Sequence, residues 1–146
     1  LARGGGWILN LSSTTVLHPD AAPYDPQNRS YQFHQNTAPT LYGSTKAALE
    51  RTSAGLAAEL APVNIAVNTL APVEAVASAG ALKTGAIDAV AHMEPEEAMA
   101  EAALQLCSRP QAQLSGRCVL SLPLLRELGV AVHTLDGQTP LPDYAF

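Results

Sequence analysis

The amino-acid sequence predicts an α/β fold in which three parallel strands are flanked by helices. Short, apolar and partly β-branched runs, which are typical of strands, alternate with longer Ala-rich runs, which are typical of helices. The predicted order is strand, helix, strand, helix, strand. Right-handed crossovers place such strands parallel in one sheet and pack the helices on its faces.

Three segments have the composition of strands. Residues 7–12 (WILNLS) are short and nearly all apolar, which favours a strand buried on both faces. Residues 64–70 (NIAVNTL) alternate polar and apolar side chains, and residues 117–122 (RCVLSL) form the third strand. The first strand would lie at an open edge of the sheet. Because of this edge, and because the first residue is Leu1, we expect the sequence to begin within a longer protein.

Helical runs lie between the strands. Residues 40–60 combine leucines with many alanines, and Pro62 ends this helix. Residues 75–92 are small and Ala-rich, which predicts one or two short helices. A further helix begins at Pro95, which two glutamates follow, and ends before Pro110.

The remaining segments bear on the domain organisation, which we expect to be a single domain over residues 1–146. Residues 16–41 contain four prolines and are predicted to be a loop insertion. Long loops in compact domains are often lids or binding loops, and a disordered insertion is the alternative. Residues 123–146 are predicted to be an irregular C-terminal extension after a short helical patch that ends at Leu128.

The composition limits the classes of function. With 47% hydrophobic and 14% charged residues, the 146-residue chain is predicted to be globular. A net charge of −5 argues against nucleic acid or an anionic membrane as the main partner. No run approaches the length of a membrane span, and no basic, apolar and small-residue succession at the N-terminus reads as a signal peptide. Cys107 and Cys118 are expected to be reduced thiols of a cytoplasmic protein, although a pair could form a bridge.

Tyr42 and Lys46 stand four residues apart at the start of the helix 40–60, so both side chains lie on one face. A free phenol is a poor acid or base at neutral pH. An ammonium group held close to it favours the phenolate, and such a pair can exchange a proton with an alcohol or a developing alkoxide. An ordinary surface Tyr and Lys is the alternative, because a two-position pattern often arises by chance.

A hydroxyl cluster from Ser12 to Thr15 closes the first predicted strand. Ligands of open α/β sheets bind at the carboxyl ends of the strands, and local turn chemistry is the alternative. No metal site and no hydrolase site is predicted. Neither H-E-x-x-H nor G-x-S-x-G occurs, and the histidines are scattered at His18, His34, His92 and His133.

Three motifs, in this order, resemble those of the short-chain dehydrogenase/reductase family. Residues 8–13 (ILNLSS) resemble its fifth strand with the serine that ends it, and residues 42–46 (YGSTK) resemble its Tyr-x-x-x-Lys. Residues 65–72 (IAVNTLAP) resemble its sixth strand, which in the family ends in Pro-Gly. The resemblance spans residues 6–122 and implies the C-terminal part of a doubly wound parallel sheet (Rossmann-like) of the classical type.

The resemblance implies a catalytic role for three residues. Ser13 would hydrogen-bond the substrate carbonyl or hydroxyl and stabilise the charge that develops there. Tyr42 would be the general acid/base. Lys46 would hydrogen-bond the nicotinamide ribose and favour the phenolate form of Tyr42. The function implied is NAD(P)-dependent oxidation or reduction of a small carbonyl/alcohol substrate.

The implied cofactor is NAD or NADP, and its nicotinamide would lie against the backbone of Pro72 and Val73 and the hydroxyl of Ser78. Three features depart from the family pattern. Val73 stands where the family usually has glycine, and Tyr42 follows Ser13 by 29 positions, which is longer than usual. A Gly-rich phosphate loop after a strand is absent, because Leu9 occupies the third glycine position of a G-x-G-x-x-G run from Gly4. The 146 residues alone are therefore expected to be inactive.

Two alternative functions stay open. An extended-type sugar-nucleotide epimerase or dehydratase shares the serine and the Tyr-x-x-x-Lys, and the Pro-containing stretch before Tyr42 favours it. A non-catalytic, truncated interaction module is favoured by the absence of the N-terminal half. We also expect the full-length protein to be a homo-oligomer, because related enzymes commonly dimerise through the helix that corresponds to residues 40–60. Its small side chains would permit close helix approach at Ala47, Ala48, Ala54, Ala57 and Ala58.

Overall fold

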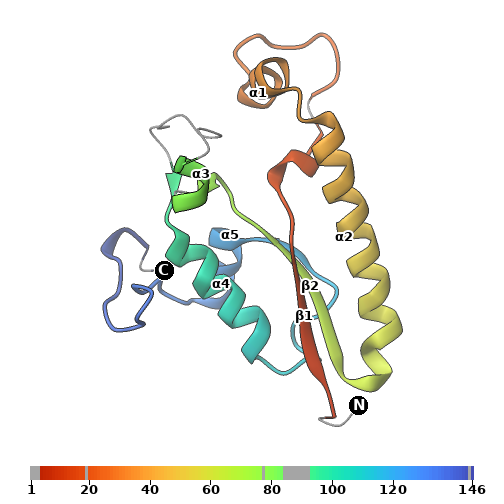
Figure 1. Cartoon of the computed structure of the whole chain (residues 1–146), viewed down its shortest axis with the longest axis vertical. Coiled ribbons are helices and arrows are strands. Elements are labelled where there is room, and N and C mark those ends of the chain that lie inside the picture. Colours follow the sequence, from red (N-terminus) through yellow and green to blue (C-terminus); the bar gives the residue numbers. More distant parts are fainter. Residues whose placement is uncertain (1–3, 19, 77, 84–92, 145) are drawn as a thin grey trace.

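The computed structural model describes residues 4–18, 20–76, 78–83, 93–144 and 146. Figure 1 shows a sheet with one long helix on one side and shorter helices on the other. The elements are β1 (Gly6–Leu11), the 3-10 turn η1 (Thr14–Val16), α1 (Arg29–Thr37), α2 (Thr40–Leu60), η2 (Ala61–Val63), β2 (Ile65–Ala71), β3 (Ala75–Val76), α3 (Ala79–Lys83), β4 (Met93–Glu94), α4 (Glu96–Ser108), β5 (Cys118–Leu120), α5 (Ser121–Leu128) and η3 (Pro142–Tyr144).

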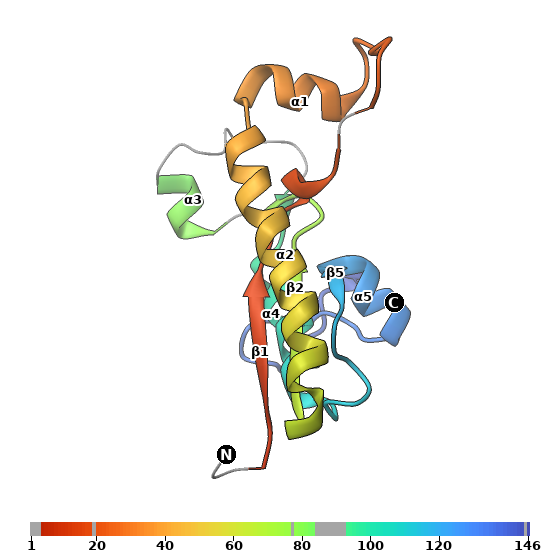
Figure 2. The same cartoon turned by 90° about the vertical axis from the view of Figure 1, so that its right-hand side faces the viewer.

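The main sheet has three parallel strands in the order β1-β2-β5. Strands β1 and β2 pair over their full length, from Gly6↔Ile65 to Leu11↔Leu70, whereas β5 pairs with the last three residues of β2. Helix α2 lies on one face, and α4 and α5 lie on the other (Figures 1 and 2). The predicted α/β fold with three parallel strands and flanking helices is confirmed.

The core lies between the sheet and helices α4 and α5. Strand β2 is central, and six of its seven residues are buried. Burial of a leucine side chain contributes about 1.5–3 kcal/mol. The buried core residues are Leu70, Ala98, Ala102, Leu106, Leu114, Leu124, Leu125 and Val132.

Asn68 is a polar residue within the buried strand β2, and two hydrogen bonds account for it. Its Nδ2 donates to the carbonyl of Leu114 at 2.9 Å, and its Oδ1 accepts from the backbone N–H of Arg117 at 3.0 Å. Because a buried amide must be hydrogen-bonded, Asn68 fixes the turn that leads into β5. The alternation seen in residues 64–70 therefore reflects a turn partner and not a solvent-exposed face.

Strand β1 is an edge strand, as predicted, but it is not buried on both faces. Trp7, Ile8 and Leu11 are 42%, 38% and 56% exposed. The expectation of double burial is wrong, because the helices packed on the sheet leave these side chains partly open to solvent. Leu9 is its side chain that packs against the core.

The segment 16–41, predicted to be a loop, contains helix α1. The side chain of Asn28 caps the helix by accepting from the N–H of Tyr31 at 3.1 Å. The helix ends at Thr37, and its C-cap residue Ala38 has a left-handed φ of 47°. Prolines on both sides masked this helix in the sequence. In both views α1 lies beyond the N-terminal end of α2 (Figures 1 and 2).

Two other predicted elements change. The third strand is shorter than residues 117–122, because α5 begins at Ser121. Helix α5 ends at Leu128, where the short helical patch before the irregular tail was predicted to end. Residues 75–76 form β3, which pairs in parallel with β4, where short helices were predicted for 75–92. Residues 77 and 84–92 of that prediction lie outside the described residues, and α3 agrees with it. Within the described ranges, no helix is both long and apolar enough to cross a membrane.

Candidate active site

Helix α2 is attached to β1 by side chains on one of its faces. Ser12 Oγ donates to Glu50 Oε1 at 2.6 Å, and Asn10 Nδ2 donates to Ser53 Oγ at 2.9 Å. Positions 46, 50 and 53 recur at helical spacing, so they share the face that meets the strand. Tyr42 lies one turn before Lys46 on that face. It therefore projects past the carboxyl end of β1.

The first turns of α2 pack closely on η1 because residue 43 is glycine. A Cβ atom at Gly43 would lie 2.4 Å from the carbonyl oxygen of Thr15, a distance that no side chain can occupy. This contact brings the turn from Ser13 to Thr15 against the start of α2. The helix and the hydroxyl cluster therefore share one end of the sheet.

Tyr42 and Lys46 form the centre of the candidate site. Tyr42 is 51% exposed, and Lys46 Nζ lies 5.6 Å from the centre of its ring, within the range of a cation–π contact. Lys46 Nζ also donates to the carbonyl of Leu11 at 2.8 Å. An ammonium group has three donors. The geometry thus holds Lys46 between the end of β1 and the phenol, with donors left for a ligand.

Ser13 is the second residue after the end of β1, and it caps η1. Its Oγ accepts from the backbone N–H of Thr15 at 3.2 Å and from Thr15 Oγ1 at 3.1 Å. The turn chemistry considered as the alternative is therefore present. Since these contacts use the oxygen as an acceptor, the O–H of Ser13 is still a donor. Such a donor can hydrogen-bond a substrate oxygen.

The loop after β2 carries the residues predicted to contact the cofactor. Because Leu11 pairs with Leu70, the segments that follow β1 and β2 lie at the same end of the sheet, and Ser13 and Pro72 follow these strands. The N–H of Val73 donates to Glu94 Oε2 at 2.7 Å, so this donor is occupied by a side chain. The backbone N–H of Ser78 donates to the carbonyl of Val76 at 2.7 Å.

Glu94 is a residue that sequence reasoning missed. It is 2% exposed, although glutamate is rarely buried. In the sequence it stands just before Pro95 and two further glutamates, so it resembles another acidic residue at a helix start. No signal in the sequence distinguishes it from them, because its burial depends on the pairing of β3 with β4.

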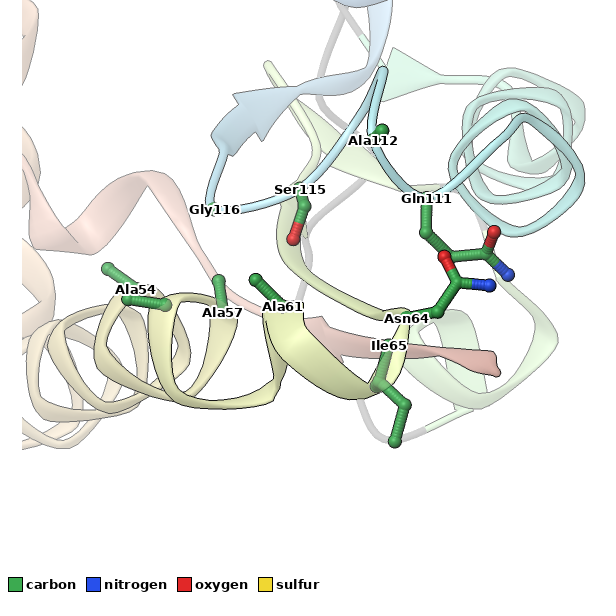
Figure 3. A pocket seen from close by; sticks show the side chains of 10 residues that line it. Ala54, Ala57, Ala61, Asn64, Ile65, Gln111, Ala112, Ser115 and Gly116 are labelled. Carbon is green, nitrogen blue, oxygen red and sulfur yellow. The ribbon is translucent and has the colours of Figure 1, made fainter. Parts of the chain in front are cut away.

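A cavity among the described residues lies away from the candidate site. It has a volume of about 430 Å³ and is open to solvent between the end of α2 and the loop that precedes β5. Figure 3 shows Ala54, Ala57 and Ala61 on one side and Gln111 and Ser115 on the other. Ile65 at the amino end of β2 contributes to it. None of the predicted site residues lines this cavity.

Comparison with solved structures identifies the class of protein that this fold and site define. A short-chain dehydrogenase/reductase family protein matches with a TM-score of 0.58 and 27% identity, over 82% of this chain and 45% of that chain. L-Sorbose reductase from Gluconobacter frateurii, complexed with NADPH and L-sorbose, matches with a TM-score of 0.58 and 26% identity, over 82% of this chain and 46% of that chain. A predicted dehydrogenase from Xanthomonas campestris matches with a TM-score of 0.58 and 26% identity, over 96% of this chain and 45% of that chain.

The class is thus a Rossmann-like α/β protein. Its resemblance to the short-chain dehydrogenase/reductase family, first indicated by three sequence motifs, is confirmed. The chain spans less than half the length of each of these solved relatives. No family model matches the sequence, and no curated protein matches it.

Proposed function

We propose that this chain carries the proton-transfer site of an NAD(P)-dependent oxidoreductase of the classical short-chain type, which acts on a carbonyl/alcohol pair. The observation that supports it best is the placement of Tyr42 and Lys46 on one face of α2, past the carboxyl end of β1. Ser13 follows that strand and lies on the turn against which α2 packs.

In this proposal each side chain has one task. Tyr42 Oη gives a proton to the substrate oxygen during reduction and takes it back during oxidation. The positive charge of Lys46, tied to the carbonyl of Leu11, stabilises the phenolate that forms in reduction. The O–H of Ser13 donates to the same substrate oxygen and stabilises its developing charge.

The donor set of this end of the sheet suits the nicotinamide half of NAD or NADP. Lys46 has donors beyond its contact with Leu11, which fits a ribose hydroxyl. Pro72 and Val73 would contribute backbone atoms, and Ser78 would contribute its hydroxyl, as the family resemblance implies. Since Val73 N–H is already bound to Glu94, this residue would meet the nicotinamide through its other atoms. The bound cofactor would supply the hydride chemistry.

The other half of the dinucleotide has no matching cradle among the described residues. A pyrophosphate is usually held by a Gly-rich turn between a strand and a helix N-terminus. Strand β1 is followed instead by Ser12 to Thr15, and β2 is followed by Pro72 and Val73. Catalysis is therefore proposed for a protein in which further residues complete the cofactor site, and not for these 146 residues alone.

A polyhydroxylated ketone is the first substrate class to assay, because L-sorbose is bound by one of the solved relatives. We also propose a homo-oligomer formed through the exposed alanines of α2, and a cytoplasmic location, which the two free cysteines favour. The segment 16–41 is proposed to form the substrate-side wall of the site. Its helix α1 reaches the loop after β2 through the ion pair of Arg29 with Glu74 at 3.4 Å.

The experiment is an oxidoreductase assay of the full-length protein with each of NADH and NADPH and a panel of ketoses, simple ketones and sugar nucleotides. Loss of the nicotinamide absorbance that depends on substrate supports the proposal. Conversion of a sugar nucleotide without net change in that absorbance would support the epimerase alternative. Cofactor binding without any turnover across the panel would favour a non-catalytic role.

A further inference from the structure

Glu94 places a buried carboxyl group beside the loop that follows β2. Its Oε2 atom accepts a hydrogen bond from the backbone N–H of Val73 at 2.7 Å. Its Oε1 atom is also buried, and it has no hydrogen-bond partner among the described residues. One oxygen of this carboxyl group is therefore used and the other is not.

Fold stability alone does not account for a carboxyl group at this place. A buried oxygen without a partner destabilises the native state, because its hydration is lost and not replaced. An apolar side chain of similar length, such as methionine, would fill the same volume without that loss. What such a side chain could not do is accept the hydrogen bond from Val73.

The rest of the geometry shows what this hydrogen bond holds. Strands β3 and β4 pair in parallel at Ala75↔Met93 and Val76↔Glu94, which fixes the far end of the loop. The carboxyl group of Glu94 fixes the near end at Val73. Pro95 follows Glu94 and restricts its backbone to an extended conformation. Both ends of the loop are thus held by contacts with β4, which lies directly before α4 in the chain.

We propose that Glu94 is a positioning residue that holds the Pro72–Val73 backbone in the conformation that meets the nicotinamide. This inference rests on the proposed function for the identity of the ligand, but not for the contact itself. The position after Pro72 is valine here, where glycine is usual in the family that the chain resembles. A backbone with a side chain has fewer accessible conformations than glycine, and the carboxyl group selects one of them.

The test compares Glu94→Met, which cannot accept from Val73, with Glu94→Gln, whose amide oxygen can. Glu96→Met is the matched control, because Glu96 is exposed and lies two residues further along. The first measurement is hydrogen–deuterium exchange of the peptide that covers residues 72–76 in the full-length protein without cofactor. The second is the Kd for NAD and NADP by calorimetric titration.

We expect Glu94→Met to raise the exchange rate of this peptide and the Kd each by about tenfold, the effect of losing one hydrogen bond. The thermal unfolding temperature should not fall in parallel, because the unpartnered oxygen is removed as well. Glu94→Gln and Glu96→Met should stay near wild type in both measurements. If Glu94→Met does not fold, Glu94→Leu removes the same acceptor and is judged by the same measurements.

Unchanged exchange and an unchanged Kd in Glu94→Met would overturn the inference, as would an equal loss in Glu94→Gln. A faster exchange with an unchanged Kd would also overturn it, since the loop would then be held for the fold alone. A wild type that binds neither NAD nor NADP overturns the proposed function instead, and with it the ligand-positioning role. In that case the exchange data still report whether Glu94 holds the loop.

Discussion

Lys46 follows Tyr42 by one turn of α2, and its ammonium nitrogen lies 5.6 Å from the centre of the Tyr42 ring. The same nitrogen donates to the carbonyl of Leu11 at 2.8 Å. One cation therefore connects the phenol to the last residue of β1. Because the contact is to backbone, the position of the pair relative to the sheet does not depend on another flexible side chain.

Tyr42→Phe in the full-length protein should remove turnover and leave cofactor affinity nearly intact. The change deletes the one group that exchanges a proton with the substrate, and such groups contribute about 10²–10⁴-fold to the rate. The measurements are kcat and the Kd for the cofactor. Tyr144→Phe is the matched control, because Tyr144 lies in η3 and packs against the core, outside the proposed site. A kcat near wild type in Tyr42→Phe would refute the acid/base role.

Gly43→Ala should destabilise the protein, whereas Gly55→Ala in the same helix should not. Alanine in a helix is favoured over glycine by about 0.5–1 kcal/mol. At Gly55 the new Cβ would meet the flexible end of Arg51 at 3.2 Å, which can move aside. At Gly43 it would lie 2.4 Å from the carbonyl oxygen of Thr15.

Overpacking of this kind costs about 1–3 kcal/mol, which exceeds the gain in helix propensity. The free energy of unfolding, from chemical denaturation, distinguishes the two variants. Gly43→Ala should also lower activity, because α2 must move away from the turn that carries Ser13. Equal stability of the two variants would mean that the close approach of α2 to η1 is not needed.

The sequence predicted the parts of the site that depend on local spacing. The separation of Tyr42 and Lys46 required only a helix, and the position of Ser13 required only the end of a strand. Glu94 could not be predicted, because its burial depends on two-residue strands that pair across residues 77–92. Helix α1 was missed for another reason. Prolines indicated a loop, while Asn28, which caps the helix, is equally common in turns.

The alanines of α2 divide between two faces, and this sharpens the oligomer prediction. Ala57 is 6% exposed, so it offers little surface to a partner, and the proposed contact is restricted to the exposed alanines. Ala47, Ala54 and Ala58 are exposed and recur at i, i+7 and i+11, which aligns them along the helix.

Ala58→Arg should therefore convert an oligomer into a smaller species, because a long charged side chain prevents close helix approach. Sedimentation of the full-length protein gives the mass. Ala58→Ser is the control, because it changes the residue but keeps its side chain small. A wild type that already sediments as a monomer would refute this prediction. So would an Ala58→Arg variant with the wild-type mass.

The ion pair of Arg117 with Glu127 should make stability depend on pH in the acid range. Two contacts of 2.9 and 2.6 Å join the guanidinium to the carboxylate, which connects the start of β5 to α5. The hydrogen bond from Arg117 lowers the pKa of Glu127 below its ordinary value and raises the pKa of Arg117.

The pKa of Glu127 is lower in the folded state than in the unfolded state. Its stabilising contribution is therefore present above the unfolded-state pKa of about 4.3. The contribution is lost as the pH falls through the folded value. Glu127→Gln should thus be slightly less stable than wild type at neutral pH, and the difference should vanish in acid. Thermal unfolding at several pH values tests this, with Glu59→Gln on the exposed side of α2 as the control. A difference that is independent of pH would contradict it.

The 146 residues by themselves should not bind NAD or NADP with useful affinity. Tyr42, Lys46 and the loop at Pro72 can contact the nicotinamide end, which leaves the adenosine and both phosphates in water. A few hydrogen bonds of about 1 kcal/mol each cannot offset the cost of immobilising so large a ligand. The open edge of β1, with Trp7 and Leu11 exposed, should also make the isolated chain prone to association.

Calorimetric titration of the purified chain with each dinucleotide measures the affinity, and light scattering measures association. The full-length protein is the positive control, and it should bind one of the two cofactors under the same conditions. The nicotinamide mononucleotide, which lacks the adenosine half, should bind the chain no more weakly than the whole dinucleotide does, because the missing half makes no contact. Micromolar binding of NAD or NADP to a monomer of this chain would show that these residues hold the whole cofactor. The phosphates would then be held by residues outside the segments that follow β1 and β2.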